Sequence, residues 1–213
     1  MATDLRALRT DYVGEPLPDD VATADPWALF ARWMDEAIEA ELPEPNAMTV
    51  STVRPDGRPH SRVVLLKEYS ADGLVFFTDY GSAKGEHLAV NPVAGALFYW
   101  PGPMRQIHAV GTVTRLDRAA SEAYFHSRPR ASQISAAVSQ QSRPLGSRAQ
   151  LEAELAEATR EIGDDEVPMP TTWGGFVVDV EEFEFWQGLP SRQHDRVRLT
   201  RTRDGWIGTR LYP

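Results

Sequence analysis

The sequence predicts a mainly β fold with surrounding helices, of the α+β class, in which the strands are antiparallel. Strand-like runs come in pairs joined by turn residues such as Asp72-Gly73 and Asp204-Gly205, which is typical of β-hairpins. The strands do not alternate one by one with helices, as they would in a parallel βαβ fold. No Gly-x-Gly-x-x-Gly motif follows a strand, which argues against a Rossmann-type dinucleotide site.

Composition limits the classes of partner. The 213 residues are 42% apolar and 25% charged, with a net charge of −9. This is an ordinary globular composition, and its acidity argues against nucleic acid or an anionic membrane as the main partner. The chain has no cysteine, which excludes disulfides, thiolate metal sites and a cysteine nucleophile. It also lacks an apolar leader and an apolar run long enough to span a membrane, so we expect a cytoplasmic protein.

The first 23 residues are polar and contain Gly14, Pro16 and Pro18. They are expected to form a mobile N-terminal arm, with a disordered tail as the alternative. Residues 24–213 are expected to form a single domain. Asp25 followed by Pro26 is a helix start, and an apolar stripe of helical spacing follows it up to Pro43.

The remaining elements follow from periodicity and from capping residues, and together they make about eight strands and four or five helices. The expected strands and helices, in chain order, are strand 48–53, strands 62–67 and 74–77 joined as a hairpin, helix 84–90, strands 94–100 and 105–115, helices 117–128, 132–139 and 147–162, strands 176–180 and 183–186, and a final hairpin of 196–202 with 206–211.

The segment from Arg62 to Gly85 has the residue types of a phosphate site. Basic residues flank its buried strands, and a loop ending in Gly81-Ser82 leads to Lys84 at the start of a helix. Hydroxyls, backbone N–H groups and a cation at a helix N-terminus suit a phosphate. The alternative is an ordinary β-hairpin with solvated charges at its ends.

A second set of polar residues follows the middle of the chain. Tyr124 and Arg128 are four residues apart, which would place a hydroxyl and a guanidinium on one helix face, and Ser132 comes just after Pro129. These groups suit an oxyanion. The alternative is a surface arginine beside a core tyrosine.

A third set lies near the C-terminus. Arg192, His194 and Arg196 alternate, so in an extended strand they would share one face, where an anionic or electron-rich ligand would relieve their repulsion. Trp186 nearby offers a flat aromatic surface. The alternative for His194 is an ordinary core or surface histidine. No His-x-x-x-His pair or carboxylate cluster suggests a metal site, and no serine lies in a nucleophile-elbow context.

Several separated motifs occur in an order that resembles the pyridoxamine 5′-phosphate oxidase family. The resemblance covers nearly the whole chain and is strongest in Arg62–Lys67, Phe125–Arg130, Val138–Ser142, Trp173–Phe176, Glu184–Gly188 and Arg192–Arg196. It implies an FMN-binding split β-barrel that works as a homodimer with the active site at the interface. It also implies oxidation of pyridoxamine 5′-phosphate or pyridoxine 5′-phosphate to pyridoxal 5′-phosphate, with O2 as acceptor and hydrogen peroxide as product.

The resemblance also implies roles for individual residues. The FMN phosphate would be held by Arg62 and Lys84, and the rest of the cofactor pocket would comprise Val63, Val64, Leu65, Leu66, Lys67, Phe77, Thr78, Ser82, Gln106, Gln141, Ser142, Trp186 and Arg196. The substrate phosphate would bind Lys67, Tyr124, Arg128 and Ser132. Arg192 and His194 would be catalytic and lie over the substrate ring, and Arg9 and Tyr12 of the arm would fold over it as a lid. No metal is implied.

Two positions depart from the family pattern. Ala83 stands where many members have a second basic residue, and Asp11 shortens the acid of the arm motif. Two alternative functions remain open. One is a related FMN oxidase of another ring substrate, such as a phenazine-type precursor, which would not need the phosphate-binding set. The other is a non-catalytic flavin-binding module, which would be expected to have lost Arg192 and His194.

Overall fold

The computed structural model describes residues 4–6, 8 and 11–213. In this part of the chain there are nine strands, five α-helices and two short 3-10 helices. The chain divides into two compact units. The first comprises residues 1–49, 95–110 and 180–213, and the second comprises residues 50–94 and 111–179.

The strands are hydrogen-bonded in the order β2-β1-β5-β6-β7-β4-β3, and β8 pairs with both β7 and β9. The pairs β3–β4, β4–β7, β7–β8 and β8–β9 are all antiparallel, which confirms the predicted class. The strands are β1 (Ala47–Val53), β2 (Pro59–Leu65), β3 (Glu68–Ser70), β4 (Gly73–Asp79), β5 (Val93–Trp100), β6 (Arg105–Arg115), β7 (Trp173–Gln187), β8 (Asp195–Thr202) and β9 (Gly205–Leu211).

In the first unit, helix α1 (Pro26–Glu39) packs its aromatic side chains against the second half of β7. The side chain of Asp25 accepts a hydrogen bond from the backbone N–H of Trp27, which caps the helix as the sequence predicts. Trp27 packs edge-on against Phe183 at 4.9 Å between ring centroids, and Trp33 packs against Phe185 at 5.4 Å. Full burial of an aromatic side chain, as of Phe183 and Phe185, contributes about 1.5–3 kcal/mol to stability.

The C-terminal hairpin belongs to the same unit. Its strands β8 and β9 are joined by a turn at Arg203-Asp204, one residue earlier than predicted, and Gly205, the first residue of β9, has a positive φ of 126°. The short helix η1 (Asp19–Thr23) lies against this hairpin, because a Cβ at Gly208 would be 2.0 Å from the carbonyl oxygen of Ala22. A second short helix, η2 (Pro190–Arg192), precedes β8.

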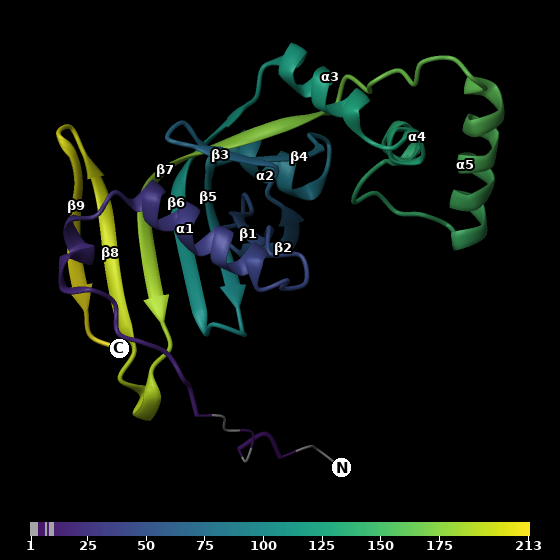
Figure 1. Cartoon of the computed structure of the whole chain (residues 1–213). Coiled ribbons are helices and arrows are strands. Elements are labelled where there is room, and N and C mark those ends of the chain that lie inside the picture. The colour runs from purple at the N-terminus through teal and green to yellow at the C-terminus, as the bar shows by residue number, and fades with distance from the viewer. Residues whose placement is uncertain (1–3, 7, 9–10) are drawn as a thin grey trace. The chain divides into compact units, whose positions relative to one another are not determined.

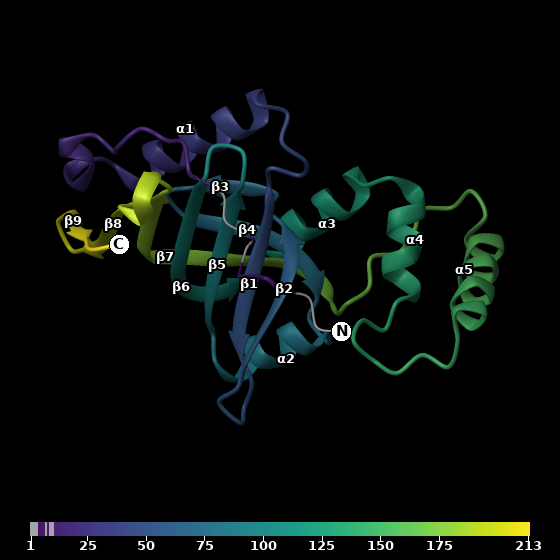
Figure 2. The ribbon, with the colours of Figure 1, turned by 90° about the horizontal axis from the view of Figure 1, so that it is seen from below.

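In the second unit, side chains cap three helices. Ser82, Asp117 and Ser147 accept hydrogen bonds from backbone N–H groups at the starts of the helices α2 (Ala83–Val90), α3 (Arg118–Ser127) and α5 (Arg148–Ile162), respectively. Helix α4 (Arg130–Val138) follows α3 after Pro129, and Figures 1 and 2 both show α4 beside α5. A core cluster holds these helices against the start of β7, and its buried members are Phe125, Ile134, Val167, Met169 and Trp173.

Two expected elements are wrong in detail. The strand before the Asp72-Gly73 turn is β3, which pairs with β4, whereas β2 ends at Leu65 and pairs with β1. The two strands expected over 176–186 are one continuous strand, β7. Between Phe176 and Val180 the even-numbered residues are buried, and from Phe183 onward the odd-numbered residues are buried. The alternation therefore changes phase at Glu181-Glu182, which in the sequence looks like a break between two strands.

None of the described helices is both long enough and apolar enough to cross a lipid bilayer.

Candidate functional site

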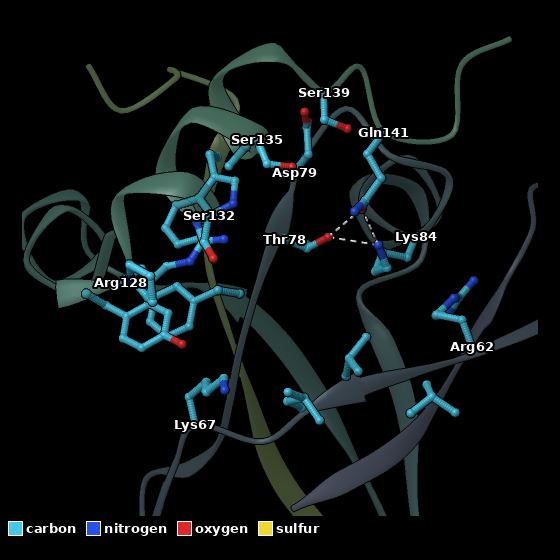
Figure 3. A pocket seen from close by; sticks show the side chains of 18 residues that line it. Arg62, Lys67, Thr78, Asp79, Lys84, Arg128, Ser132, Ser135, Ser139 and Gln141 are labelled. Atoms are coloured by element: carbon cyan, nitrogen blue, oxygen red, sulfur yellow. Dashed lines mark hydrogen bonds between the residues drawn. The ribbon is translucent and has the colours of Figure 1, made fainter. Parts of the chain in front are cut away.

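A cavity of about 670 Å³ lies in the second unit, among β2, β4, α2, the end of α3 and α4. Four basic side chains line it, and Figure 3 shows Arg62 near Lys84 on one side, with Arg128 and Lys67 on the other. In a protein with a net charge of −9, such a local group of cations has the charge that suits an anionic ligand.

Lys84 lies at the first turn of α2 and is buried. Its Nζ donates to Thr78 Oγ1 at 2.8 Å, to Gln141 Oε1 at 2.6 Å and to Ser82 Oγ at 3.3 Å (Figure 3). Burial, and then the charge of Arg62, lower the pKa of Lys84 to about 8, while Asp79 acts in the opposite direction. The ammonium thus has neutral acceptors but no ion pair among the described residues, and an arriving anion would supply one.

Arg62 on β2 is held by its own network. Its Nη1 donates to the carbonyl oxygen of Val50 and to Thr52 Oγ1, both at 2.9 Å, and its Nη2 lies 2.9 Å from His60 Nδ1. Thr52 Oγ1 is in turn 2.9 Å from Nδ1 of the buried His87. Burial lowers the pKa of Arg62. These contacts fix the guanidinium at the edge of the cavity.

On the other side of the cavity, Arg128 directly follows the last residue of α3. Its guanidinium carbon lies 4.9 Å from the ring centroid of Trp173, and its Nη1 is buried without a hydrogen-bond partner in the described part of the chain. Tyr124 stacks on Phe77 with 3.9 Å between ring centroids. The expected shared helix face is therefore wrong, because Arg128 has extended backbone angles beyond the helix end. Both side chains nevertheless line the cavity.

The cavity brings together most of the predicted residues of this unit. These are Arg62, Val63, Val64, Leu65, Lys67, Phe77, Thr78, Lys84, Tyr124, Arg128, Ser132 and Gln141. Leu66, Ser82 and Ser142 are not among the lining residues, since Leu66 is buried and Ser82 caps α2. Sequence reasoning missed the lining residues Asp79, Pro129, Ser135, Ala136, Ser139 and Trp173.

Two of the missed groups had a signal in the sequence. Ser135 and Ser139 follow Ser132 at spacings of three and seven, which places them on one face of a helix. Trp173 opens one of the motifs that carries the family resemblance. Its ring contacts Phe77, Tyr124 and Arg128, so it forms part of the cavity wall.

A second cluster of predicted residues lies in the first unit. The rings of Trp186 and His194 are 4.7 Å apart, and Tyr12 lies 5.2 Å from His194 and 6.0 Å from Trp186. Arg192 Nη1 donates to the Tyr12 hydroxyl at 3.2 Å. Burial, and then the charge of Arg192, lower the pKa of His194. Arg9 lies outside the described residues.

The expected alternation of Arg192, His194 and Arg196 along one strand is wrong. β8 begins only at Asp195, and Arg192 ends η2 with a positive φ of 62°, after Ser191 at 56°. Arg196 instead pairs with Glu184, with 2.9 Å between Arg196 Nε and Glu184 Oε1. Gln106 lies on β6 in the same unit, half-buried.

The fold and the cavity define the chain as a split β-barrel protein with a pocket lined by four basic side chains. A family model described as pyridoxamine 5′-phosphate oxidase matches residues 34–160, and one described as the pyridoxine 5′-phosphate oxidase C-terminal dimerisation region matches residues 173–213. The chain belongs to the pyridoxamine 5′-phosphate oxidase family.

Individual relatives agree with this. A pyridoxine/pyridoxamine 5′-phosphate oxidase of Herminiimonas arsenicoxydans is 47% identical over 97% of this chain and 98% of its own. PhzG from Burkholderia lata 383, solved in complex with tetrahydrophenazine-1-carboxylic acid, superimposes with a TM-score of 0.87 at 29% identity, covering 94% of this chain and 99% of that chain. A pyridoxamine 5′-phosphate oxidase-related, FMN binding protein of Nostoc punctiforme has a TM-score of 0.71 at 19% identity over 90% and 100% of the two chains, and shares the fold.

Proposed function

We propose that this protein is an FMN-dependent oxidase that converts pyridoxamine 5′-phosphate and pyridoxine 5′-phosphate to pyridoxal 5′-phosphate, with O2 as acceptor and hydrogen peroxide as product. The observation that carries the proposal is the arrangement of cations in one cavity. Arg62 and Lys84 lie on one side, and Arg128 and Lys67 lie on the other (Figure 3). A cofactor and a substrate that each carry a phosphate need two such sites.

The residues around Lys84 fit the phosphate of FMN. Lys84 has three neutral acceptors and no carboxylate bonded to it among the described residues. Arg62 lies beside it and offers a planar set of donors. When bound, FMN supplies the ring that accepts a hydride from the substrate. The contribution of the chain is to hold that ring in a fixed place.

The residues around Arg128 fit the phosphate of the substrate. A buried guanidinium N–H without a partner carries the cost of its lost hydration, and a phosphate oxygen would offset this cost. The Tyr124 hydroxyl, the Ser132 hydroxyl and the Lys67 ammonium belong to the same cavity wall. Together they would fix one end of the substrate and leave its reacting carbon to face the flavin.

Arg192 and His194 would contact the substrate ring. The backbone N–H of Leu189 donates to His194 Nδ1 at 3.1 Å, so a neutral His194 carries its proton on Nε2 and presents it as a donor. Both residues lie in the region matched by the C-terminal dimerisation model. We propose that the protein is a homodimer in which each active site lies at the interface and takes residues from both chains.

Because the fold is similar to that of PhzG, a second function remains a candidate for this protein: oxidation of a ring substrate that carries no phosphate. A substrate without a phosphate would offer no anionic group to Lys67 and Arg128 in the cavity. A flavin-binding module without turnover would have no use for Arg192 and His194. The presence of these four side chains therefore favours the phosphorylated B6 substrate.

The test is an anaerobic absorbance titration of the purified, FMN-loaded protein with pyridoxamine 5′-phosphate. We expect the flavin to bleach and to recover its colour when air is admitted. Flavin that stays oxidised with this substrate but bleaches with a phenazine-type precursor would support the second candidate. A protein that binds no FMN would refute both.

A further inference from the structure

Leu17 and Pro18, in the last part of the N-terminal arm, are fixed to the C-terminal hairpin by an ion pair of the first unit. The backbone N–H of Leu17 donates to Asp195 Oδ2 at 2.7 Å. Arg210 Nη2 donates to the carbonyl oxygens of Leu17 and Pro18 at 2.9 and 2.7 Å, and Arg210 Nη1 pairs with Asp195 Oδ1 at 3.2 Å. The Asp195–Arg210 pair thus binds both the donor and the acceptor of one arm residue.

Gly14 provides a second attachment of the arm, at the end of β7. A Cβ at this position would lie 2.4 Å from the carbonyl oxygen of Gly188 and 2.6 Å from Nε2 of Gln187. Gln187 is buried, and its Oε1 accepts from Arg105 Nε at 2.9 Å while its Nε2 donates to the Pro103 carbonyl at 3.0 Å. Because Gln187 is held in this way, it has little room to move, and only a glycine fits above it.

Tyr12 lies two residues before Gly14 and contacts both residues that the proposed function places over the substrate ring. Its hydroxyl accepts from Arg192, and the guanidinium carbon of Arg192 lies 5.1 Å from the centroid of its ring. The same ring lies against His194. The position of Tyr12 therefore depends on where the chain is held at Gly14 and Leu17.

We propose that Gly14 and the Asp195–Arg210 pair, here called the arm anchor, position Tyr12 on Arg192 and His194. Gly14, Asp195 and Arg210 are then positioning residues that act through Tyr12. The part of this inference that concerns turnover rests on the proposed function. Asp195 also sits between His194 and Arg196, so the experiment must separate an action through Tyr12 from a direct action on those neighbours.

The structural part is tested by NMR on the full-length, FMN-loaded protein, without any substrate. We expect Asp195→Ala to speed hydrogen exchange of the Leu17 amide by roughly tenfold or more, because the amide loses its acceptor. Gly14→Ala and Asp195→Ala should both weaken the NOE between the Tyr12 and His194 rings. The control is Asp19→Ala, which removes an exposed carboxylate 3.9 Å from Arg210 Nη2 and should change neither signal. An unchanged Leu17 exchange rate and an unchanged NOE in Asp195→Ala would overturn the inference.

The catalytic part is tested with pyridoxine 5′-phosphate. Gly14→Ala and Asp195→Ala should each lower kcat/KM on the order of tenfold, because a contact residue is misplaced. In a Tyr12→Ala background the same changes should have little further effect. A full additional loss in that background would mean that the anchor acts on His194 or Arg196 directly. If the wild-type protein does not turn over pyridoxine 5′-phosphate, the proposed function is refuted but the arm anchor is not. The NMR measurements test the positioning of Tyr12 by the arm anchor without any substrate.

Discussion

The guanidinium of Arg128 packs on the indole of Trp173, with 4.9 Å from Cζ to the ring centroid, and one of its buried nitrogens has no partner in the described chain. The aromatic face holds the cation in place without satisfying its N–H groups. The Arg128 side chain is therefore ready for an oxyanion before any ligand binds.

Replacement of Arg128 should affect phosphorylated substrates specifically. We expect Arg128→Ala to raise KM for pyridoxine 5′-phosphate roughly 10–100-fold, the range for a hydrogen bond to a charged group, and to change KM for pyridoxine far less. Steady-state kinetics with both substrates measure this. The control is Arg130→Ala, whose guanidinium bonds the Gly163 carbonyl outside the cavity. Equal effects on both substrates would place the phosphate elsewhere.

FMN affinity should fall at alkaline pH because of Lys84. The pKa of this lysine is about 8 in the free protein, and a bound phosphate dianion raises it. Above about pH 8 Lys84 is mostly neutral in the free protein, so FMN binding must take up a proton. The dissociation constant of FMN should therefore rise by up to about tenfold for each pH unit above this value. Fluorescence titration of FMN from about pH 7 to about pH 10 measures the effect. Lys84→Arg keeps its charge over this range, so its dissociation constant should stay flat.

Arg192 should matter for turnover but not for cofactor retention. It lies in the second cluster, where it donates a hydrogen bond to Tyr12. We expect Arg192→Ala to keep its FMN and to lower the rate of substrate-driven flavin reduction about 100-fold or more, since orientation of the ring is lost. Stopped-flow absorbance under anaerobic conditions measures this rate. Arg203→Ala, in the exposed turn of the last hairpin, is the control, and normal reduction by Arg192→Ala would remove the residue from the site.

Gly85 should be intolerant of a side chain. A Cβ there would lie 2.1 Å from the carbonyl oxygen of Tyr80, which is backbone and cannot move without shifting the loop before α2. We expect Gly85→Ala to lower the free energy of unfolding by about 1–3 kcal/mol and to weaken FMN binding as well. At Gly146 the nearest atom is the flexible Oε1 of Gln150, at 2.7 Å, so Gly146→Ala should cost less than about 0.5 kcal/mol. Urea denaturation of both variants makes the comparison, and equal losses would contradict the steric argument.

Local signals predicted the elements best. The start of α1 follows from two neighbouring residues, the N-cap Asp25 and Pro26 at the first helical position. Strand β6 runs from Arg105 to Arg115, as its alternation of apolar and polar residues predicts. The course of β7 could not be predicted, because its burial changes phase at Glu181-Glu182 and the backbone stays extended only through pairing with distant strands. The pairing of β3 with β4 could not be predicted either, because it depends on β2 pairing with β1 instead of with β4.

The site was predictable as a set of residue types but not as a network. Arg62, Lys84 and Arg128 were expected to bind anions, and the structure places all three around one cavity. The bond between Lys84 and Gln141 joins residues 57 positions apart, and no pattern in the sequence indicates it. Tyr12 and Arg192 are 180 positions apart, so their contact likewise needs the fold. The roles assigned to these side chains stay predictions.

The two consecutive left-handed residues before β8 have a consequence for protein engineering. Ser191 and Arg192, with φ of 56° and 62°, each hold a conformation that costs a non-glycine residue of the order of 1 kcal/mol or more. A screen that selects for heat resistance alone would favour Ser191→Gly, because glycine adopts this conformation without strain. The same change would give the backbone before Arg192 more freedom, and the guanidinium would lose its fixed direction. With the role proposed for Arg192, thermal stability and turnover would be in conflict at this position, and selection for activity would keep the strained serine.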